Sequence, residues 1–299
     1  MYAAFDQWAD DGTATGGLWW LDTSTLPAGE PEPIPGEWDD VGGQLLAVTT
    51  DSSGDVWAGG GSGLWRHDGE SSRRSRTDTF AGWTVGFVAV APDGTPWVGD
   101  CGSSSVRVSG GWQPLPDAPA IGGCAAVVDH RGTRWLAART GPARLDGDRW
   151  VGATTDASGT AFFDLNPSAG EGGDDPPWAL VVTGDGTLWA AMIGVVDGLW
   201  RWADGAWERE LIDETPGLRR VQTVAAGGEG ELLVASADAV HVVDDGLWGS
   251  IPVPEGPASP IRSLAADAGV VWASTDDALL HFDGERRDRH DRPPDTVPD

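Results

Sequence analysis

Carboxylates are the most abundant side chains in this sequence that could do chemistry. The 299-residue chain has 47 acidic residues against 19 arginines, no lysine, and a formal net charge of -28. Adjacent aspartates stand at residues 10–11, 174–175 and 276–277, and calcium takes six to eight oxygen ligands. No D-x-D-x-D-G loop surrounds them, and chance pairs are expected in so acidic a chain. The sequence therefore predicts a solvated acidic surface, with no metal site and no cofactor.

The two cysteines, Cys101 and Cys124, are the other reactive side chains. Two are too few for a disulfide-rich scaffold or a four-cysteine zinc site. No histidine maps beside them, which argues against a mixed metal site. They can form one disulfide bond or remain two partly buried thiols, and mass spectrometry of the unreduced protein distinguishes these states.

One pattern recurs along the chain at intervals of about 40 residues. Each unit has a short apolar run, a turn built on Asp-Gly or a similar pair, and a second run. At the centre of that second run stands Trp57, Trp97, Trp135, Trp189, Leu233 or Trp272. A third run follows, and another tight turn leads to a fourth.

Short runs of small and β-branched residues between Gly-rich turns are typical of strands. Four such strands in about 40 residues, repeated, predict the blades of a β-propeller. We therefore expect an all-β, seven-bladed β-propeller of four-stranded antiparallel blades, with six complete repeats plus a partial N-terminal blade. In that arrangement the recurring tryptophans pack between neighbouring blades.

The two ends of the chain depart from the repeat. Residues 1–4 align with residues 188–191, so the N-terminal unit has no visible innermost strand, which favours a start upstream of Met1. We expect one propeller domain over residues 1–285 and a charged, proline-rich tail over 286–299, disordered because proline cannot donate to a strand ladder. The sequence contains no signal peptide. The compartment therefore stays unassigned, and is extracytoplasmic if the start lies upstream.

The consensus D-x-x-G-x-x-W followed by G-L-W-R resembles the two-component regulator propeller repeat. Residues 185–189 (DGTLW) and 198–201 (GLWR) match it best, and the resemblance extends over nearly the whole chain. Residues 229–233 (EGELL) depart from it, so that blade is expected to be imperfect. Propellers of that family form the sensory part of larger signalling proteins, often outside the cytoplasm. The resemblance therefore implies a sensory or signalling module, or a fragment of one.

Loop length distinguishes the two ends of each expected blade. The turns between first and second strands, and between third and fourth, are short, whereas residues 5–12, 154–177 and 192–197 form long connections at the other end. Binding sites usually lie in long loops on a rigid scaffold. Cys101 and Cys124 map to this same end, on adjacent blades. We expect ligand binding near the channel mouth by Trp8, Asp10, Asp100, Phe162, Phe163, Asp164, Met192 and Asp197.

Propeller enzymes are the alternative to a binding propeller. A sialidase needs a tyrosine nucleophile, and the single tyrosine is Tyr2; the G-x-S-x-G motif of serine hydrolases is absent. A lactonase-type site uses glutamate, asparagine and aspartate around a metal, and the single asparagine, Asn166, precedes Pro167. A streptogramin-lyase-like site needs a histidine and a glutamate at the channel mouth, whereas three of the five histidines map to third strands. We therefore expect a non-catalytic binding propeller, with a streptogramin-lyase-like or lactonase-like enzyme as the alternative.

Charge and hydropathy restrict the partners. A net charge of -28 excludes nucleic acid, because phosphate binding rests on clustered lysine and arginine. No stretch approaches the roughly 18 apolar residues of a membrane-spanning helix, so membrane insertion is not expected. We expect a monomer whose partner is a small molecule or a protein segment.

Overall fold

The structure is a computed structural model, and it describes part of the chain. For the N-terminal sheet, and for single residues such as Cys124 and Met192, it describes the backbone alone. The described residues are 2–8, 14–20, 32–33, 45–61, 63–75, 84–100, 103–116, 121–138, 141–153, 155–159, 178–192, 198–210, 221–228, 230–236, 239–244, 247–252, 261–267, 269–275, 278–283 and 287–291.

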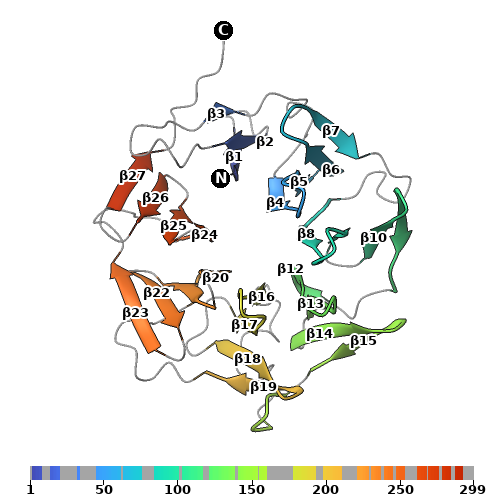
Figure 1. The fold of residues 1–299 in the computed structure, drawn as a ribbon, viewed down its shortest axis with the longest axis vertical. Helices are drawn as coiled ribbons and strands as arrows, with labels where there is room; N and C mark the ends of the chain where they lie inside the picture. The colour runs from blue at the N-terminus through green and yellow to red at the C-terminus, as the bar shows by residue number, and fades with distance from the viewer. Residues whose placement is uncertain are drawn as a thin grey trace. The chain divides into compact units, whose positions relative to one another are not determined.

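The chain divides into two compact units, the first over residues 1–139 and 143–152 and the second over 140–142 and 153–299. The first unit holds three four-stranded sheets and one three-stranded sheet, and the second holds three four-stranded sheets. Within each sheet the strands follow one another in chain order and neighbours pair antiparallel (Figure 1).

The first unit contains three blades. Their strands are β4 (Leu45–Thr50), β5 (Val56–Gly60), β6 (Gly63–His67) and β7 (Ser72–Ser75); β8 (Phe87–Val90), β9 (Pro96–Gly99), β10 (Ser104–Val108) and β11 (Gly111–Pro114); and β12 (Ile121–Val128), β13 (Arg134–Ala138), β14 (Gly141–Asp146) and β15 (Arg149–Gly152).

The second unit contains the other three blades. Their strands are β16 (Trp178–Val182), β17 (Leu188–Met192), β18 (Leu199–Ala203) and β19 (Ala206–Arg209); β20 (Thr223–Ala226), β21 (Leu232–Ala235), β22 (Ala239–Asp244) and β23 (Leu247–Pro252); and β24 (Ser263–Asp267), β25 (Val270–Ser274), β26 (Ala278–Phe282) and β27 (Arg287–Asp291).

The fold is an all-β six-bladed β-propeller of four-stranded antiparallel blades, so the prediction of seven blades is wrong. The N-terminal segment forms a three-stranded sheet of β1 (Tyr2–Trp8), β2 (Ala14–Trp20) and β3 (Glu32–Pro33). Ala4 faces Leu18 there, as Ala191 faces Leu199 between a second and a third strand. The prediction divided the chain length by the repeat spacing. It therefore counted the N-terminal segment, which has three strands, as a seventh blade.

The strand β27 lies inside the segment expected to be a disordered tail. It pairs with β26 over five residues, with Asp288 opposite His281 and Arg289 opposite Leu280. Residues 292–299 lie outside the described residues, and the division into one domain and a tail stays a prediction.

Aspartate organises the turn between first and second strands. In the β4–β7 blade the Asp51 carboxylate accepts hydrogen bonds from the backbone N–H groups of Ser53 (2.9 Å) and Asp55 (3.1 Å). Gly54 completes this turn at φ 84°, a left-handed conformation that glycine adopts without a steric cost. Asp129 forms the same turn in the β12–β15 blade. The Asp-x-x-Gly spacing therefore encodes a specific turn geometry.

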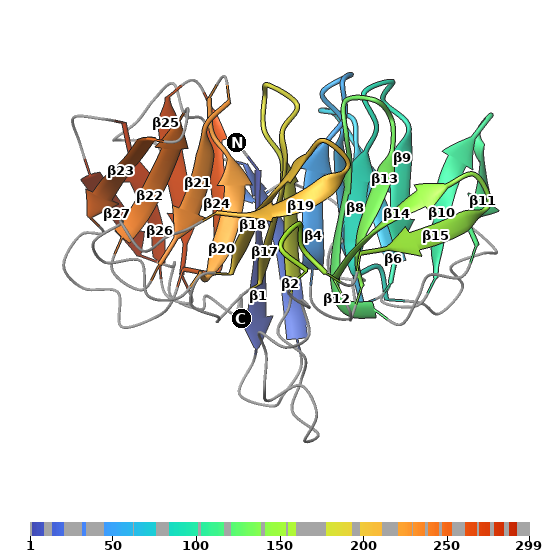
Figure 2. The same cartoon turned by 90° about the horizontal axis from the view of Figure 1, so that it is seen from below.

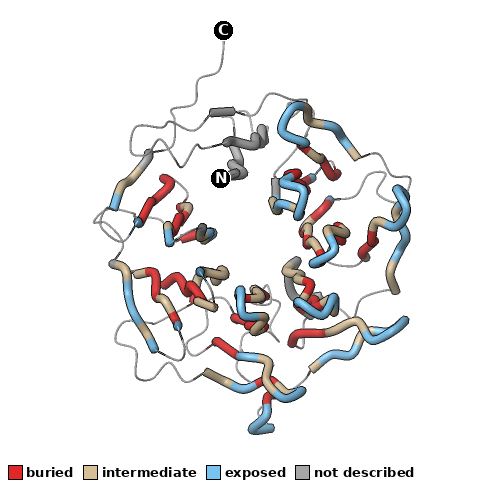
Figure 3. Tube along the Cα trace, viewed as in Figure 1, coloured by how far each residue is buried: buried red, intermediate tan, exposed pale blue. Residues whose placement is uncertain are grey.

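Tryptophans link neighbouring blades of the first unit, as the sequence predicted. Trp57 on β5 makes an edge contact with Trp112 on β11 of the next blade, with ring centroids 6.5 Å apart. Trp97 on β9 stacks on Trp150 on β15 at 6.0 Å. Each contact joins the second strand of one blade to the fourth strand of the next, and all five recurring tryptophans are buried. Figure 3 shows where buried segments lie along the trace.

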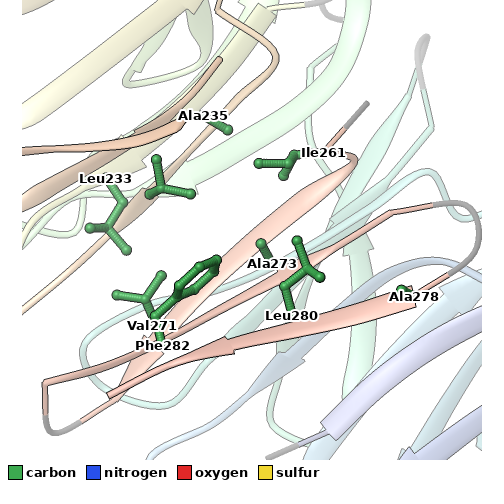
Figure 4. Close-up of a cluster of buried hydrophobic side chains, with 9 residues drawn as sticks. Leu233, Ala235, Ile261, Val271, Ala273, Ala278, Leu280 and Phe282 are labelled. Atoms are coloured by element: carbon green, nitrogen blue, oxygen red, sulfur yellow. The ribbon is translucent and has the colours of Figure 1, made fainter. Parts of the chain in front are cut away.

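Leucine replaces tryptophan in the β20–β23 blade without loss of a strand. Leu233 is 1% exposed and belongs to one apolar cluster with Val271 and Phe282 of the following blade (Figure 4). Phe282 is itself fully buried. The phenyl ring of the next blade thus supplies volume that an indole supplies elsewhere, which explains why the departure from the motif leaves the blade complete.

Candidate binding face

Each blade has a turn end and a loop end. In an antiparallel four-stranded sheet, the connection between strands two and three and the exit from strand four lie at the same end. We call this the loop end; Figure 2 shows the blades from the side. From the strand bounds, the longest blade-to-blade connection at the loop end is residues 153–177. The longest connection there between a second and a third strand is residues 193–198. The first-to-second and third-to-fourth turns are short, as predicted.

Asp100 is the predicted binding residue whose side chain the structure describes. It opens the connection between β9 and β10, where its Oδ1 accepts hydrogen bonds from Ser103 N (2.6 Å) and Ser103 Oγ (3.3 Å). Its own N–H donates to Ser103 O at 3.0 Å. The carboxylate therefore closes a four-residue turn at the loop end.

Two other blades close the same turn with a hydroxyl. Ser236 N donates to Ala239 O, and Thr275 N donates to Ala278 O, both at 2.9 Å. The Thr275 hydroxyl also donates to Ala278 O, and Ser236 Oγ donates to Ala239 O. Asp100, Ser236 and Thr275 thus occupy one repeat position with one structural role. Sequence reasoning missed this equivalence because the three side chains differ in type.

An apolar residue two positions before the first strand anchors each described blade-to-blade connection. Val85, Val221 and Ile261 are buried and pack in clusters with residues of the preceding blade. Val85 N donates to Gly60 O at 2.9 Å, and Ile261 N donates to the Gln222 side-chain oxygen at 2.9 Å. The C-terminal end of each of these connections is therefore held against the preceding blade. At two of the three positions the sequence offered a signal, since Val221 follows two arginines and Ile261 follows a proline.

The histidines do not form a cluster in the described residues. His67, His241 and His281 lie on the third strands β6, β22 and β26, as predicted, and all three are buried. His67 Nδ1 lies 3.1 Å from Ser72 Oγ, and His281 Nδ1 lies 3.7 Å from the Asp288 carboxylate. Each contact joins a third strand to the adjoining fourth strand.

A serine and a histidine approach each other beneath the loop end of the β20–β23 blade. Ser236 Oγ lies 3.1 Å from His241 Nε2, the spacing of a nucleophile and its base. The two residues are 0% and 1% exposed. Ser236 Oγ also lies 3.1 Å from Ala239 O, so the same hydroxyl contacts both the loop-end turn and the third strand of its own blade. The pair stabilises the loop.

Arginines occupy a repeat position opposite the recurring tryptophan. Arg66 faces Trp57 with its guanidinium 5.5 Å from the ring centroid, and it pairs with Asp55. Arg201 faces Trp189 and pairs with Glu208 at 3.1 Å. Arg66 and Arg201 are therefore engaged within their own blades.

The other predicted site residues are not placed by side chain. Trp8 ends β1, Met192 ends β17, and Cys124 lies in β12, where the register shifts between Ile121 and Ala126. For these three the structure describes the backbone alone. The remaining predictions lie outside the described residues, at Asp10, Cys101, Phe162, Phe163, Asp164 and Asp197. The binding cluster therefore stays a prediction, and Cys101 and Cys124 keep both alternatives, one disulfide bond or two thiols.

Two further properties concern the described residues only. They contain no group of three or more His, Cys, Asp or Glu side chains placed to hold a metal ion. No helix among them has the length and apolar character needed to cross a membrane.

Sequence comparison gives no match, either to a protein-family model or to a curated protein. Solved structures match in fold. Virginiamycin B lyase from Staphylococcus aureus superposes with a TM-score of 0.65 at 12% identity, over 92% of this chain and 97% of the lyase chain. The extracellular domain of a hybrid two component system from B. thetaiotaomicron gives 0.61 at 15%, over 96% of this chain and 48% of that one.

A third match is YCF48 bound to D1 peptide, with a TM-score of 0.59 at 16% identity, over 83% of this chain and 80% of that chain. At such identities the likeness shows the β-propeller fold alone. The resemblance to two-component propellers is thus confirmed as a shared fold, without a family match.

Proposed function

We propose that this chain is a non-catalytic binding propeller that acts as a sensory or signalling module, or as a fragment of one. It recognises a small molecule or a protein segment through the long connections at the loop end, residues 153–177 and 193–198. The ligand contacts are those of Trp8, Asp10, Phe162, Phe163, Asp164, Met192 and Asp197. Asp100, the eighth residue predicted from the sequence, closes its own turn through Ser103 and supports these contacts from the scaffold.

The observation that carries this proposal is the contrast among loop-end connections. The short ones at Asp100, Ser236 and Thr275 bind their own backbone, so their polar groups serve the scaffold. In the longer blade-to-blade connections, buried residues such as Val85 and Ile261 hold the C-terminal end in place. The connections at residues 153–177 and 193–198 are longer than their counterparts in the other blades. Long loops on a rigid scaffold are where recognition is usually placed.

Two of the fold matches are consistent with binding. One is described as an extracellular domain of a two component system, and another was solved with a bound peptide. A thermal-shift screen with sugars, amino acids and short peptides provides the first test. We expect a subset of compounds to raise the melting temperature, because a ligand that binds only the folded state stabilises it.

Loop replacement then locates the site. Replacing residues 160–172 by a short Gly-Ser linker should abolish the shift and leave the unliganded melting temperature nearly unchanged. The matched control replaces residues 212–218, in the β19–β20 connection, and should retain the shift. A shift that survives the first replacement would contradict the placement.

A lyase is the second candidate, because the superposition covers 97% of the virginiamycin B lyase chain. His67, His241 and His281 disfavour it, since they are buried on third strands and contact residues of their own blades. Incubation with virginiamycin B followed by mass spectrometry decides the matter. A cleavage product of virginiamycin B would support the lyase, and unchanged antibiotic at high protein concentration would remove it.

A further inference from the structure

The fourth strand β23 differs from the outer strands of the other five blades. Its sequence LWGSIP contains no charged residue, and with six residues it is the longest of the set. Four of the others, β7, β15, β19 and β27, contain arginine. The fifth, β11, has four residues and ends in proline. Charges and proline protect sheet edges from pairing with other chains. The strand β23 also ends in proline, at Pro252, but it is two residues longer than β11 and carries no charge.

An apolar side chain is displayed on this edge. Leu247 is 75% exposed, the most exposed large apolar residue among those described. The neighbouring Trp248 is half-buried and packs against a cluster that its own blade shares with the preceding blade. The strand is therefore held in place on its inner side while Leu247 faces solvent.

The register determines which backbone groups point outward. Asp244 and Leu247 close a two-residue hairpin, and the closing pair of such a hairpin bonds across the ladder. Bonded pairs alternate along an antiparallel ladder, so Gly249 and Ile251 also bond to β22. The backbone groups of Trp248 and Ser250 consequently point away from the sheet.

The neighbouring blade shows the same edge already occupied. Trp207 holds in β19 the position that Trp248 holds in β23, one residue after a hairpin of equal length. The turn at residues 155–159 lies against that edge, and Ala157 N donates to Trp207 O at 2.7 Å. Trp207 is 1% exposed. Among the described residues no backbone N–H bonds to Trp248 O.

We propose that β23 is a second interaction surface, independent of the loop-end site, which accepts an extended basic segment of a partner protein as a fifth strand. The segment pairs with the outward groups of Trp248 and Ser250, and an apolar residue of the segment covers Leu247. A second copy of this chain is disfavoured, because each copy has a net charge of -28 and two such bodies repel. A basic segment is attracted by the same charge.

The test uses a fluorescent eight-residue peptide of alternating valine and threonine with arginine at both ends, and a version with glutamate at both ends. Fluorescence anisotropy should show binding of the arginine peptide and at least about tenfold weaker binding of the glutamate peptide. Equal binding of the two, or no binding of either at millimolar concentration, overturns the proposal.

Variants distinguish peptide binding at the β23 edge from non-specific binding elsewhere on the protein. Leu247→Ser should weaken binding by about tenfold through lost apolar contact, and Ser250→Pro should do the same by removing an outward N–H. The matched control is Val151→Ser, at an exposed apolar residue on the edge strand β15. Equal losses in the control contradict the proposal. Melting temperatures verify that each variant folds.

Analytical ultracentrifugation tests whether a second copy of this chain, and not a partner segment, pairs with β23. The wild-type chain should sediment as a monomer across the concentration range. A concentration-dependent dimer that Leu247→Ser removes would show that β23 pairs with a second copy, and would overturn the proposal.

Discussion

Asp51 and Trp57 are joined by a hydrogen bond from the indole Nε1 to Oδ2, 2.9 Å long, across six residues of one hairpin. The same bond joins Asp129 to Trp135 at 3.0 Å. In the β8–β11 blade Ala91 stands where Asp51 stands, and Trp97 Nε1 is buried with no hydrogen-bond partner among the described residues. One side chain therefore sets the turn and satisfies the buried indole.

Adding the missing carboxylate should stabilise the β8–β11 blade. The turn at Ala91 already has matching backbone geometry, since Gly94 N donates to Ala91 O as Gly54 N donates to Asp51 O. We expect Ala91→Asp to raise the free energy of unfolding by about 1 kcal/mol through a bond to Trp97. Urea unfolding measures it, with Ala91→Ser as control. A destabilised Ala91→Asp protein would contradict the assignment.

Removing the indole N–H should have unequal effects in the two blades. Trp57→Phe breaks the bond to Asp51 and leaves a carboxylate oxygen without that donor, so it should cost about 1–3 kcal/mol more than Trp97→Phe. Both variants lose similar apolar area at similarly buried positions. Equal losses of unfolding free energy in the two variants would show that the Asp51 bond is energetically neutral.

Glycine at position 59 gives space to the buried anchor of the next blade. A Cβ at Gly59 would overlap Val85 Cγ1, whereas one at Gly152 would meet only Ala143 Cβ at 4.0 Å. We expect Gly59→Ala to lower the free energy of unfolding by about 1–3 kcal/mol through overpacking, and Gly152→Ala to change it little. The double variant Gly59→Ala with Val85→Ala should recover part of the loss, and complete additivity would refute the contact.

A carboxylate in the β16–β17 turn should make stability depend on acid pH. Partial burial raises the pKa of Asp185, but hydrogen bonds from the Thr183 and Thr187 hydroxyls and from Thr187 N outweigh it, and the pKa lies below 3.8. A lowered pKa adds stability above the unfolded-state value, and this is lost as the pH falls through the folded-state value.

Unfolding by urea at pH 6 and at pH 3 measures this effect. The difference in unfolding free energy between wild type and Asp185→Asn should be larger at pH 6 than at pH 3. An equal difference at the two values would show that the charged form of Asp185 receives no preferential stabilisation.

The sequence was sufficient to predict the blades and the role of the tryptophans, because Asp-Gly turns and buried strands recur at fixed spacing. It was insufficient for the outer strands. The strand β27 reads RDRHD, and the charges that protect an edge remove the apolar alternation by which a strand is recognised. The anchors Val85, Val221 and Ile261 were missed because their partners belong to the preceding blade and are distant in sequence.

The candidate site was predictable only as a set of long connections. Asp100 shows why: a carboxylate in a loop can bind a ligand or close a turn, and the position of Ser103 decides between these uses through three-dimensional geometry. The blade number failed for a related reason. Three strands with the spacing and register of a blade look like a blade until the pairing of each strand is known.

Amide hydrogen exchange with and without the compound that gives the largest thermal shift tests the binding proposal most directly. We expect added protection in peptides covering residues 153–177 and 193–198, with unchanged exchange in the turns at residues 51–55 and 129–133. Protection confined to those turns, or unchanged exchange across residues 153–177, would contradict it.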